Sequence, residues 1–166
     1  NSADILGVWR NLPMGDAYIN SLDNLQNKVF ADACAVESYD FNNPWSVKLK
    51  GKKVLVVSPF SKEIIFQYGR REYIWDNKEI LPDFSLDTVE SVWYFFGCKD
   101  ERFSNWFEAL DYLYYEITKK DFDIVLLGCG FFGFPLAARI KEAGRQAIHM
   151  GGAIQILFGI KASCIL

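Results

Sequence analysis

Residues 123–152 read DIVLLGCGFFGFPLAARIKEAGRQAIHMGG, and this stretch constrains the fold more than any other part of the chain. A short apolar run at 124–127 leads into a G-x-G-x-x-G turn at 128–133, and a helical pattern and a second apolar run ending at His149 follow. Glycines in such a turn let backbone N–H groups approach an anion, and the dipole of the next helix favours negative charge. The pattern predicts a β-loop-α-β unit with a phosphate-bearing ligand at the turn, although a tight turn that binds nothing looks the same.

The rest of the chain continues this alternation of strands and helices. Residues 54–57 are four consecutive apolar residues, as in a strand covered on both faces of a parallel sheet. A helix is expected over 61–73 with Ser61 as its N-cap, and the clearest helical spacing runs over 103–117. The other expected elements are strands at 3–9, 33–39 and 84–94 and helices at 16–30 and 153–158. This order predicts an α/β fold, a Rossmann-like three-layer sandwich with a mostly parallel sheet.

Length and composition fit a single Rossmann-like domain over 1–166. With 51% apolar and 16% aromatic residues, the chain has enough material for a core and does not resemble a disordered protein. The first residues contain no initiator Met and no signal-peptide pattern, and we expect native extensions to be lacking at both ends. No apolar run approaches the roughly 18 residues of a membrane span, so none is expected.

The charge and the cysteines exclude some partners. The net charge is −3 with both signs spread along the chain, so we expect no nucleic-acid partner. The four cysteines form no C-x-x-C pair, which argues against a structural zinc site. Isolated cysteines in apolar surroundings are typical of reduced core residues, and they predict a cytoplasmic location.

Ligands of parallel sheets bind beyond the carboxyl ends of the strands. Three segments follow predicted strand ends, at 58–61, 128–133 and 149–152, and we expect them to share one edge of the sheet. The candidate nucleotide-binding residues in and beside them are Ser58, Phe60, Gly128, Gly130, Gly133, Gly151, Gly152 and Gln155.

A dinucleotide cofactor is one interpretation of the glycine turn. The NAD fingerprint requires Asp or Glu at the end of the next strand, but residues 146–150 read QAIHM and contain no acid. Phe131 and Phe132 are also bulky where a pyrophosphate would lie. Both features disfavour NAD(P) and S-adenosylmethionine, which remain alternatives.

Two residues are candidates for catalysis. His149 is the only histidine and stands at a predicted strand end, where it could contact a phosphate, a ribose or an acceptor hydroxyl; a structural role is the alternative. Glu37 follows the segment expected to be a strand and is a candidate general base, with a surface carboxylate as the alternative. Asp121-Phe122-Asp123 spells D-x-D, but it precedes its strand, so capping or a solvated charge explains it better. No metal-ligating residue is predicted.

Six segments carry a family resemblance, namely 44–46 (PWS), 49–60 (LKGKKVLVVSPF), 122–124 (FDI), 128–130 (GCG), 146–152 (QAIHMGG) and 155–161 (QILFGIK). They resemble an uncharacterised bacterial family of capsule and surface-polysaccharide loci, over about residues 4–161. The layout is more distantly similar to GT-D-type glycosyltransferases, in which a Rossmann-like domain ends in a similar glycine turn, strand and QAI segment.

The resemblance implies a glycosyltransferase-like domain that binds a nucleotide-sugar donor and a glycan acceptor for polysaccharide biosynthesis. GT-D enzymes use a D-x-E motif with a divalent cation, and this sequence contains no D-x-E. Mn²⁺ or Mg²⁺ is therefore expected only if a longer protein supplies a carboxylate motif. The alternatives are a non-catalytic nucleotide-binding or assembly protein of a polysaccharide locus, or an NAD(P)- or S-adenosylmethionine-dependent enzyme.

Overall fold

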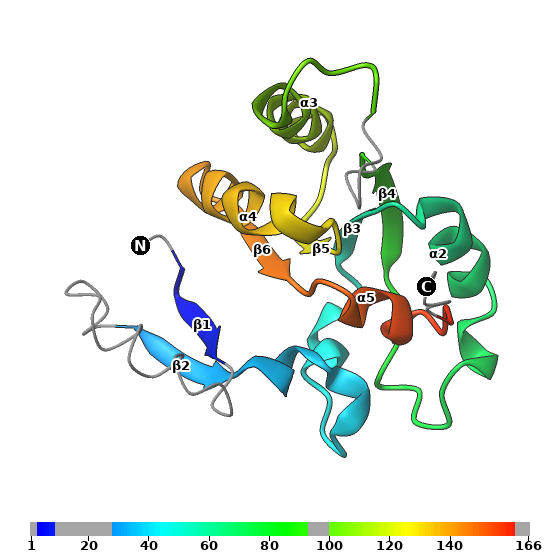
Figure 1. Cartoon of the computed structure of the whole chain (residues 1–166). Coiled ribbons are helices and arrows are strands. Elements are labelled where there is room, and N and C mark those ends of the chain that lie inside the picture. The colour runs from blue at the N-terminus through cyan, green and yellow to red at the C-terminus, as the bar shows by residue number, and fades with distance from the viewer. Residues whose placement is uncertain (1–2, 9–27, 93–99, 162–166) are drawn as a thin grey trace.

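A four-stranded parallel sheet forms the centre of the computed structural model, which describes residues 3–8, 28–92 and 100–161 (Figure 1). Every residue of its two middle strands is buried except Lys53, where one of them begins. This burial supports the prediction from their apolar runs. In spatial order the strands are β4 (Ser85–Glu90), β3 (Lys53–Ser58), β5 (Ile124–Leu127) and β6 (Gln146–His149).

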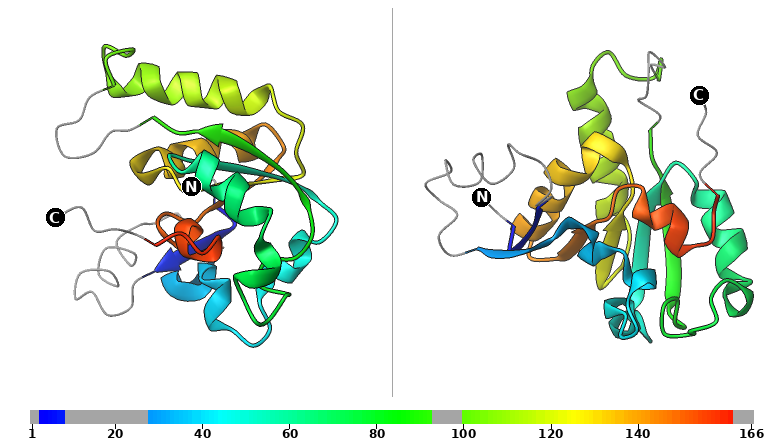
Figure 2. Two further views of the ribbon diagram at one scale, coloured as in Figure 1. Left: turned by 90° about the vertical axis from the view of Figure 1, so that its right-hand side faces the viewer. Right: turned by 60° about the horizontal axis from the view of Figure 1, so that its bottom comes forward.

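Helices cover both faces of this sheet and complete a three-layer sandwich, as Figure 2 shows from two further sides. Val56 belongs to the core on one face and Val57 to the core on the other, as the alternation of a strand requires. The first face packs against α2 (Ser61–Tyr68) and α5 (Ala153–Leu157), and the second against α3 (Trp106–Thr118) and α4 (Gly133–Glu142). The predicted Rossmann-like α/β architecture is confirmed.

The direction in which the sheet grows reverses between β3 and β5. From β3 the chain passes through α2 on the first face to β4, whereas from β5 it passes through α4 on the second face to β6. Because β3 and β5 are neighbours, α2 and α4 leave the same edge of the sheet on opposite sides. In open α/β sheets this topological switch point is where ligands bind.

A second, two-stranded parallel sheet joins β1 (Ile5–Val8) to β2 (Val29–Asp32). Strand β1 falls within the strand predicted at 3–9, which is confirmed for the residues described. The prediction of a helix over 16–30 is wrong at its end, because the last residues of that range pair with β1 instead of continuing a helix. The remainder of this predicted helix, up to residue 27, lies outside the described residues.

The strand predicted at 33–39 is wrong, because short 3₁₀ helices occupy this segment. The Asp32 carboxylate accepts a hydrogen bond from the Cys34 backbone N–H at 2.9 Å, and this local bond favours a turn over an extended chain. The segment is tied to the next one by Trp45, whose Nε1 donates to the Val36 carbonyl at 3.2 Å. The 3₁₀ helices between β2 and β3 are η1 (Ala33–Val36), η2 (Ser38–Asp40) and η3 (Trp45–Leu49).

The ends of the main helices differ from the prediction. Ser61 is the buried first residue of α2 rather than its N-cap, and the predicted helix at 61–73 divides into α2 and a 3₁₀ turn, η4 (Arg71–Tyr73). Helix α3 starts later than predicted because the Asn105 side chain caps it, accepting from the Glu108 N–H at 3.1 Å. None of the helices in the described ranges is long and apolar enough to cross a membrane.

Candidate functional site

The three predicted loop segments meet at the carboxyl edge of the sheet. Val57 is opposite Leu127, and Leu127 is opposite His149, so β3, β5 and β6 end side by side. The Gly128 N–H donates to the Val57 carbonyl at 2.8 Å, and the Met150 N–H donates to the Leu127 carbonyl at 2.9 Å. These bonds extend the ladder into the loops and place the start of all three at one edge of the sheet, as the sequence predicts.

The loop after β3 is built from within by Ser58. This side chain is fully buried, and its Oγ accepts a hydrogen bond from the Phe60 backbone N–H at 3.2 Å. The Ser58 carbonyl accepts from the Ser91 N–H at 3.1 Å, which fixes the loop against the end of β4. Ser58 therefore fixes the shape of this loop, and Phe60 is partly buried against the core that contains α2 and α5.

Two glycines of the turn are required by packing inside the protein. A Cβ on Gly128 would stand 2.2 Å from Cγ2 of Ile154, and a Cβ on Gly133 would stand 2.1 Å from Cδ2 of His149. Neither approach is possible for real atoms, so these positions accept only glycine without rearrangement. Between them, burial raises the pKa of the Cys129 thiol to about 12, which makes Cys129 a core residue rather than a nucleophile.

The other three glycines of the edge leave open space. Gly130 and Gly151 each have a φ of +56°, a conformation that favours glycine. At Gly130, Gly151 and Gly152, no heavy atom lies within 4 Å of the position that a Cβ would take. The backbone of these three residues is therefore the part of the predicted nucleotide site that a ligand can approach closely.

His149 lies between the turn and α4. Its ring packs over Gly133 and meets the Phe134 ring edge-on, with centroids 4.6 Å apart. Burial lowers the pKa of the imidazole, and a hydrogen bond with the Gly130 backbone opposes this shift. The ring is therefore neutral at pH 7, and its buried Nε2 has no hydrogen-bond partner among the described residues. This geometry gives His149 a packing role at the edge whether or not it also contacts a ligand.

Glu37 occupies a different part of the molecule. It lies between η1 and η2, next to Val36. The Val36 carbonyl accepts a hydrogen bond from Trp45, which begins the 3₁₀ helix η3 just before β3. Burial, together with the nearby Glu37 and Asp40 carboxylates, raises the pKa of Tyr39 to about 12. Since the 3₁₀ helix η1, and not a strand, directly precedes Glu37, the reason for expecting it beside the carboxyl edge is lost, and the structure groups it with Tyr39 instead of His149.

The D-x-D segment has a structural role at the amino edge. Asp123 Oδ2 accepts a hydrogen bond from the Lys53 backbone N–H at 2.8 Å, and Asp121 forms an ion pair with the Lys53 ammonium at 2.5 Å. These contacts join the starts of β3 and β5, which confirms the interpretation as capping and surface charge. Over the described ranges, no group of three or more His, Cys, Asp or Glu side chains is placed to hold a metal ion.

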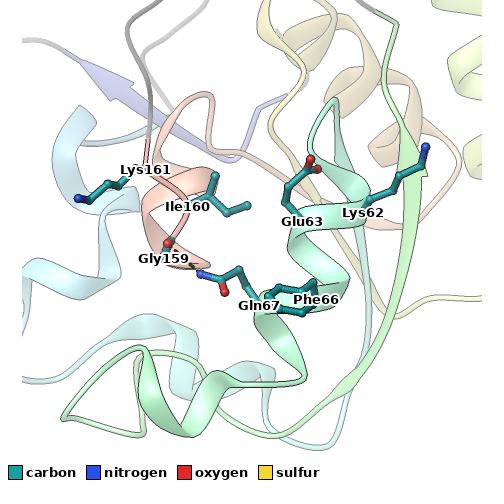
Figure 3. A pocket seen from close by; sticks show the side chains of 7 residues that line it. All are labelled: Lys62, Glu63, Phe66, Gln67, Gly159, Ile160 and Lys161. Atoms are coloured by element: carbon teal, nitrogen blue, oxygen red, sulfur yellow. Dashed lines mark hydrogen bonds between the residues drawn. The ribbon is translucent and has the colours of Figure 1, made fainter.

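A shallow groove, absent from the sequence-based site, lies between α2 and the segment after α5 (Figure 3). Its volume is about 420 Å³, and the Gln67 side chain crosses it to donate to the Gly159 carbonyl at 3.0 Å. Its lining consists of Lys62, Glu63, Phe66, Gln67, Gly159, Ile160 and Lys161. Because Lys62 is in the first turn of α2, one end of the groove reaches the carboxyl edge. The sequence signal for this groove was the QILFGIK segment at 155–161, whose last three residues line it. Gln155, the first residue of the segment, does not line the groove.

The edge thus combines open glycine backbone, the beginnings of α2 and α4 and a neutral imidazole. Such an arrangement can hold an anion through backbone N–H groups without a cationic side chain. Comparisons with protein-family models, with curated proteins and with solved structures found no match to this chain.

Proposed function

We propose that this chain is a glycosyltransferase-like domain that binds a nucleotide-sugar donor at the carboxyl edge of its sheet, for polysaccharide biosynthesis. The observation that carries the proposal is the meeting of the three loops at the switch point between β3 and β5, where open glycine backbone faces the start of α4. The diphosphate would lie over Gly130, with Gly151 and Gly152 on the side of the ribose or sugar. Ser58 and Phe60 shape the opposite wall.

The packing constraints refine the roles of the predicted residues. Gly128 and Gly133 act by letting Ile154 and His149 approach, so they support the site from beneath rather than by contact with a ligand. His149 is the catalytic candidate that lies at this edge, and as a neutral imidazole it can accept a proton. Gln155 follows the open glycines on α5, and we keep it as a polar contact for the sugar.

The acceptor and the cation belong to the same proposal. We place the glycan acceptor along the groove beside α2, because one end of that groove reaches the carboxyl edge. Mn²⁺ or Mg²⁺ would need carboxylates from outside the described ranges, since those ranges contain no suitable cluster. A cytoplasmic location fits the thiols of Cys34 and Cys129, which are both free.

A thermal-shift screen tests the binding step. UDP, GDP, CDP, NAD and S-adenosylmethionine are each added with and without Mn²⁺. We expect stabilisation by nucleoside diphosphates, reaching about 2.7 kcal/mol when the ligand is at one hundred times its Kd. Stabilisation by NAD or S-adenosylmethionine alone would overturn the proposal in favour of a cofactor-dependent enzyme. Nucleoside diphosphate binding without turnover of any sugar nucleotide would favour the non-catalytic alternative.

Variants of Gly130 locate the site. Gly130→Asp adds a negative charge where the diphosphate would lie, and we expect it to abolish nucleotide binding. Gly130→Asn adds a side chain of the same shape without the charge, and we expect it to retain most binding. Gly51→Asp is the folding control, because Gly51 has a comparable φ of +73° and open surroundings but lies before β3 at the opposite edge. Equal binding by the Gly130→Asp protein and the wild type would refute this position for the diphosphate.

A further inference from the structure

The glycine turn presents two phenylalanines to solvent. Phe131 is 85% exposed and Phe134 is 66% exposed, whereas all other residues from 132 to 140 are buried or partly buried. The 3₁₀ turn η5 (Gly130–Phe132) runs directly into α4, so Phe131 and Phe134 are three residues apart on one continuous helical path. Residues at this spacing are neighbours on the same side of a helix.

The fold explains the phenylalanine between them but not these two. Phe132 is buried, and its ring stacks on Trp106 at a centroid distance of 5.1 Å with an interplanar angle of 6°. The rings of Phe134 and His149 meet in a T-shaped contact with an interplanar angle of 71°, and Phe134 nevertheless remains 66% exposed. The sequence suggested that Phe132 would obstruct the turn, but its ring is buried and does not. The phenylalanines of the turn are anchored by two contacts, that of Phe132 with Trp106 and that of Phe134 with His149 on β6.

We infer that Phe131 and Phe134 form a platform on which the planar nucleobase of the bound nucleotide stacks. The inference rests on the proposed function, because the platform adjoins the Gly130 backbone proposed to hold the diphosphate. A base linked to that diphosphate needs an uncharged flat surface nearby. Residues 128–134 carry no acidic or basic side chain, and the adjoining His149 is neutral. An aromatic ring stacks on every base, so the platform favours nucleotides over free phosphate without selecting one base.

Titration calorimetry on the 166-residue chain tests this inference with UDP, GDP and inorganic pyrophosphate as probes. Stacking on a protein aromatic ring is worth about 1–3 kcal/mol per base, so Phe131→Ala and Phe134→Ala should weaken nucleotide binding by roughly 5- to 150-fold. Pyrophosphate affinity should stay unchanged, because it has no base. Phe131→Trp should keep nucleotide affinity, whereas Phe131→Leu should lose it although it stays apolar.

Matched controls are available on other surfaces. Tyr73→Ala removes a ring that is 87% exposed, and Tyr115→Ala removes one on α3 that is 60% exposed, both away from the turn. Neither should change nucleotide affinity. Equal nucleotide affinity of the wild type, Phe131→Ala and Phe134→Ala proteins would overturn the platform, as would a parallel loss of pyrophosphate affinity. If the wild type binds neither the nucleotides nor pyrophosphate, the proposed function itself fails.

Discussion

The contact between Gly133 and His149 gives the sharpest stability prediction. Gly133→Ala places a Cβ 2.1 Å from Cδ2 and 2.4 Å from Nε2 of an imidazole whose ring already contacts Phe134. Overpacking of this kind costs roughly 1–3 kcal/mol. Alanine regains up to about 1 kcal/mol over glycine within a helix, and less at the first residue of α4. We therefore expect a net loss of about 1–2 kcal/mol in the free energy of unfolding.

Urea denaturation followed by tryptophan fluorescence measures this loss. Gly152→Ala is the matched control, because Gly152 is likewise at the start of a helix, as the N-cap of α5, but has no heavy atom within 4 Å of the added Cβ. That substitution should be neutral or stabilising by up to about 1 kcal/mol. In the double variant Gly133→Ala/His149→Ala, the clash is absent, so the two losses should not add. The steric argument would be refuted by additive losses in the double variant. It would also be refuted if the Gly133→Ala and Gly152→Ala proteins were equally stable.

Three further predictions concern the same cores. Gly128→Ala, with its Cβ 2.2 Å from Ile154 Cγ2, should cost roughly 1–3 kcal/mol in urea denaturation and should be partly rescued by Ile154→Ala. Tyr68→Phe should cost roughly 1–3 kcal/mol in the same assay, because it leaves unpaired the buried Phe84 N–H that donates to the Tyr68 hydroxyl at 2.6 Å. Burial lowers the pKa of His149 in the folded protein, so its imidazole is protonated more readily in the unfolded chain. The free energy of unfolding should therefore fall as the pH drops below about 6.5, the ordinary pKa of histidine. His149→Gln should flatten that decline between about pH 7.5 and 5.5. An unchanged slope in the variant would contradict the assignment.

The parallel core was predictable because its signals are local. The apolar runs of β3 and β5 and the helical spacing of α3 report burial directly; both strands lie where they were predicted, and α3 differs only in its later start. Local signals failed between residues 28 and 40. One short apolar stretch there pairs with β1, and the next forms a turn because the Cys34 backbone N–H donates a hydrogen bond to the Asp32 carboxylate. Pairing with a distant strand overrides helical spacing, and periodicity alone does not show it.

The candidate site was predictable in position but not in detail. The carboxyl-edge rule placed the three loops correctly, because it needs only strand order and direction. It could not separate glycines that face a ligand from glycines that face the core, since Ile154 and His149 are brought to Gly128 and Gly133 only by the folded chain. For the same reason, the sequence could not show that Phe131 is exposed and the adjacent Phe132 is buried, because only the folded chain brings Trp106 to Phe132.

The position of α5 has a consequence for how the chain is made. The face of the sheet that contains Val54 and Val56 is closed partly by Leu157 and Phe158, about one hundred residues later in the sequence. At ordinary synthesis rates this interval lasts about 5–20 s, and during the first part of it β3 also lacks its neighbour β5. The apolar residues of β3 thus leave the ribosome long before their cover exists. We expect the nascent chain to depend on chaperone protection of residues 53–58 until that cover is synthesised.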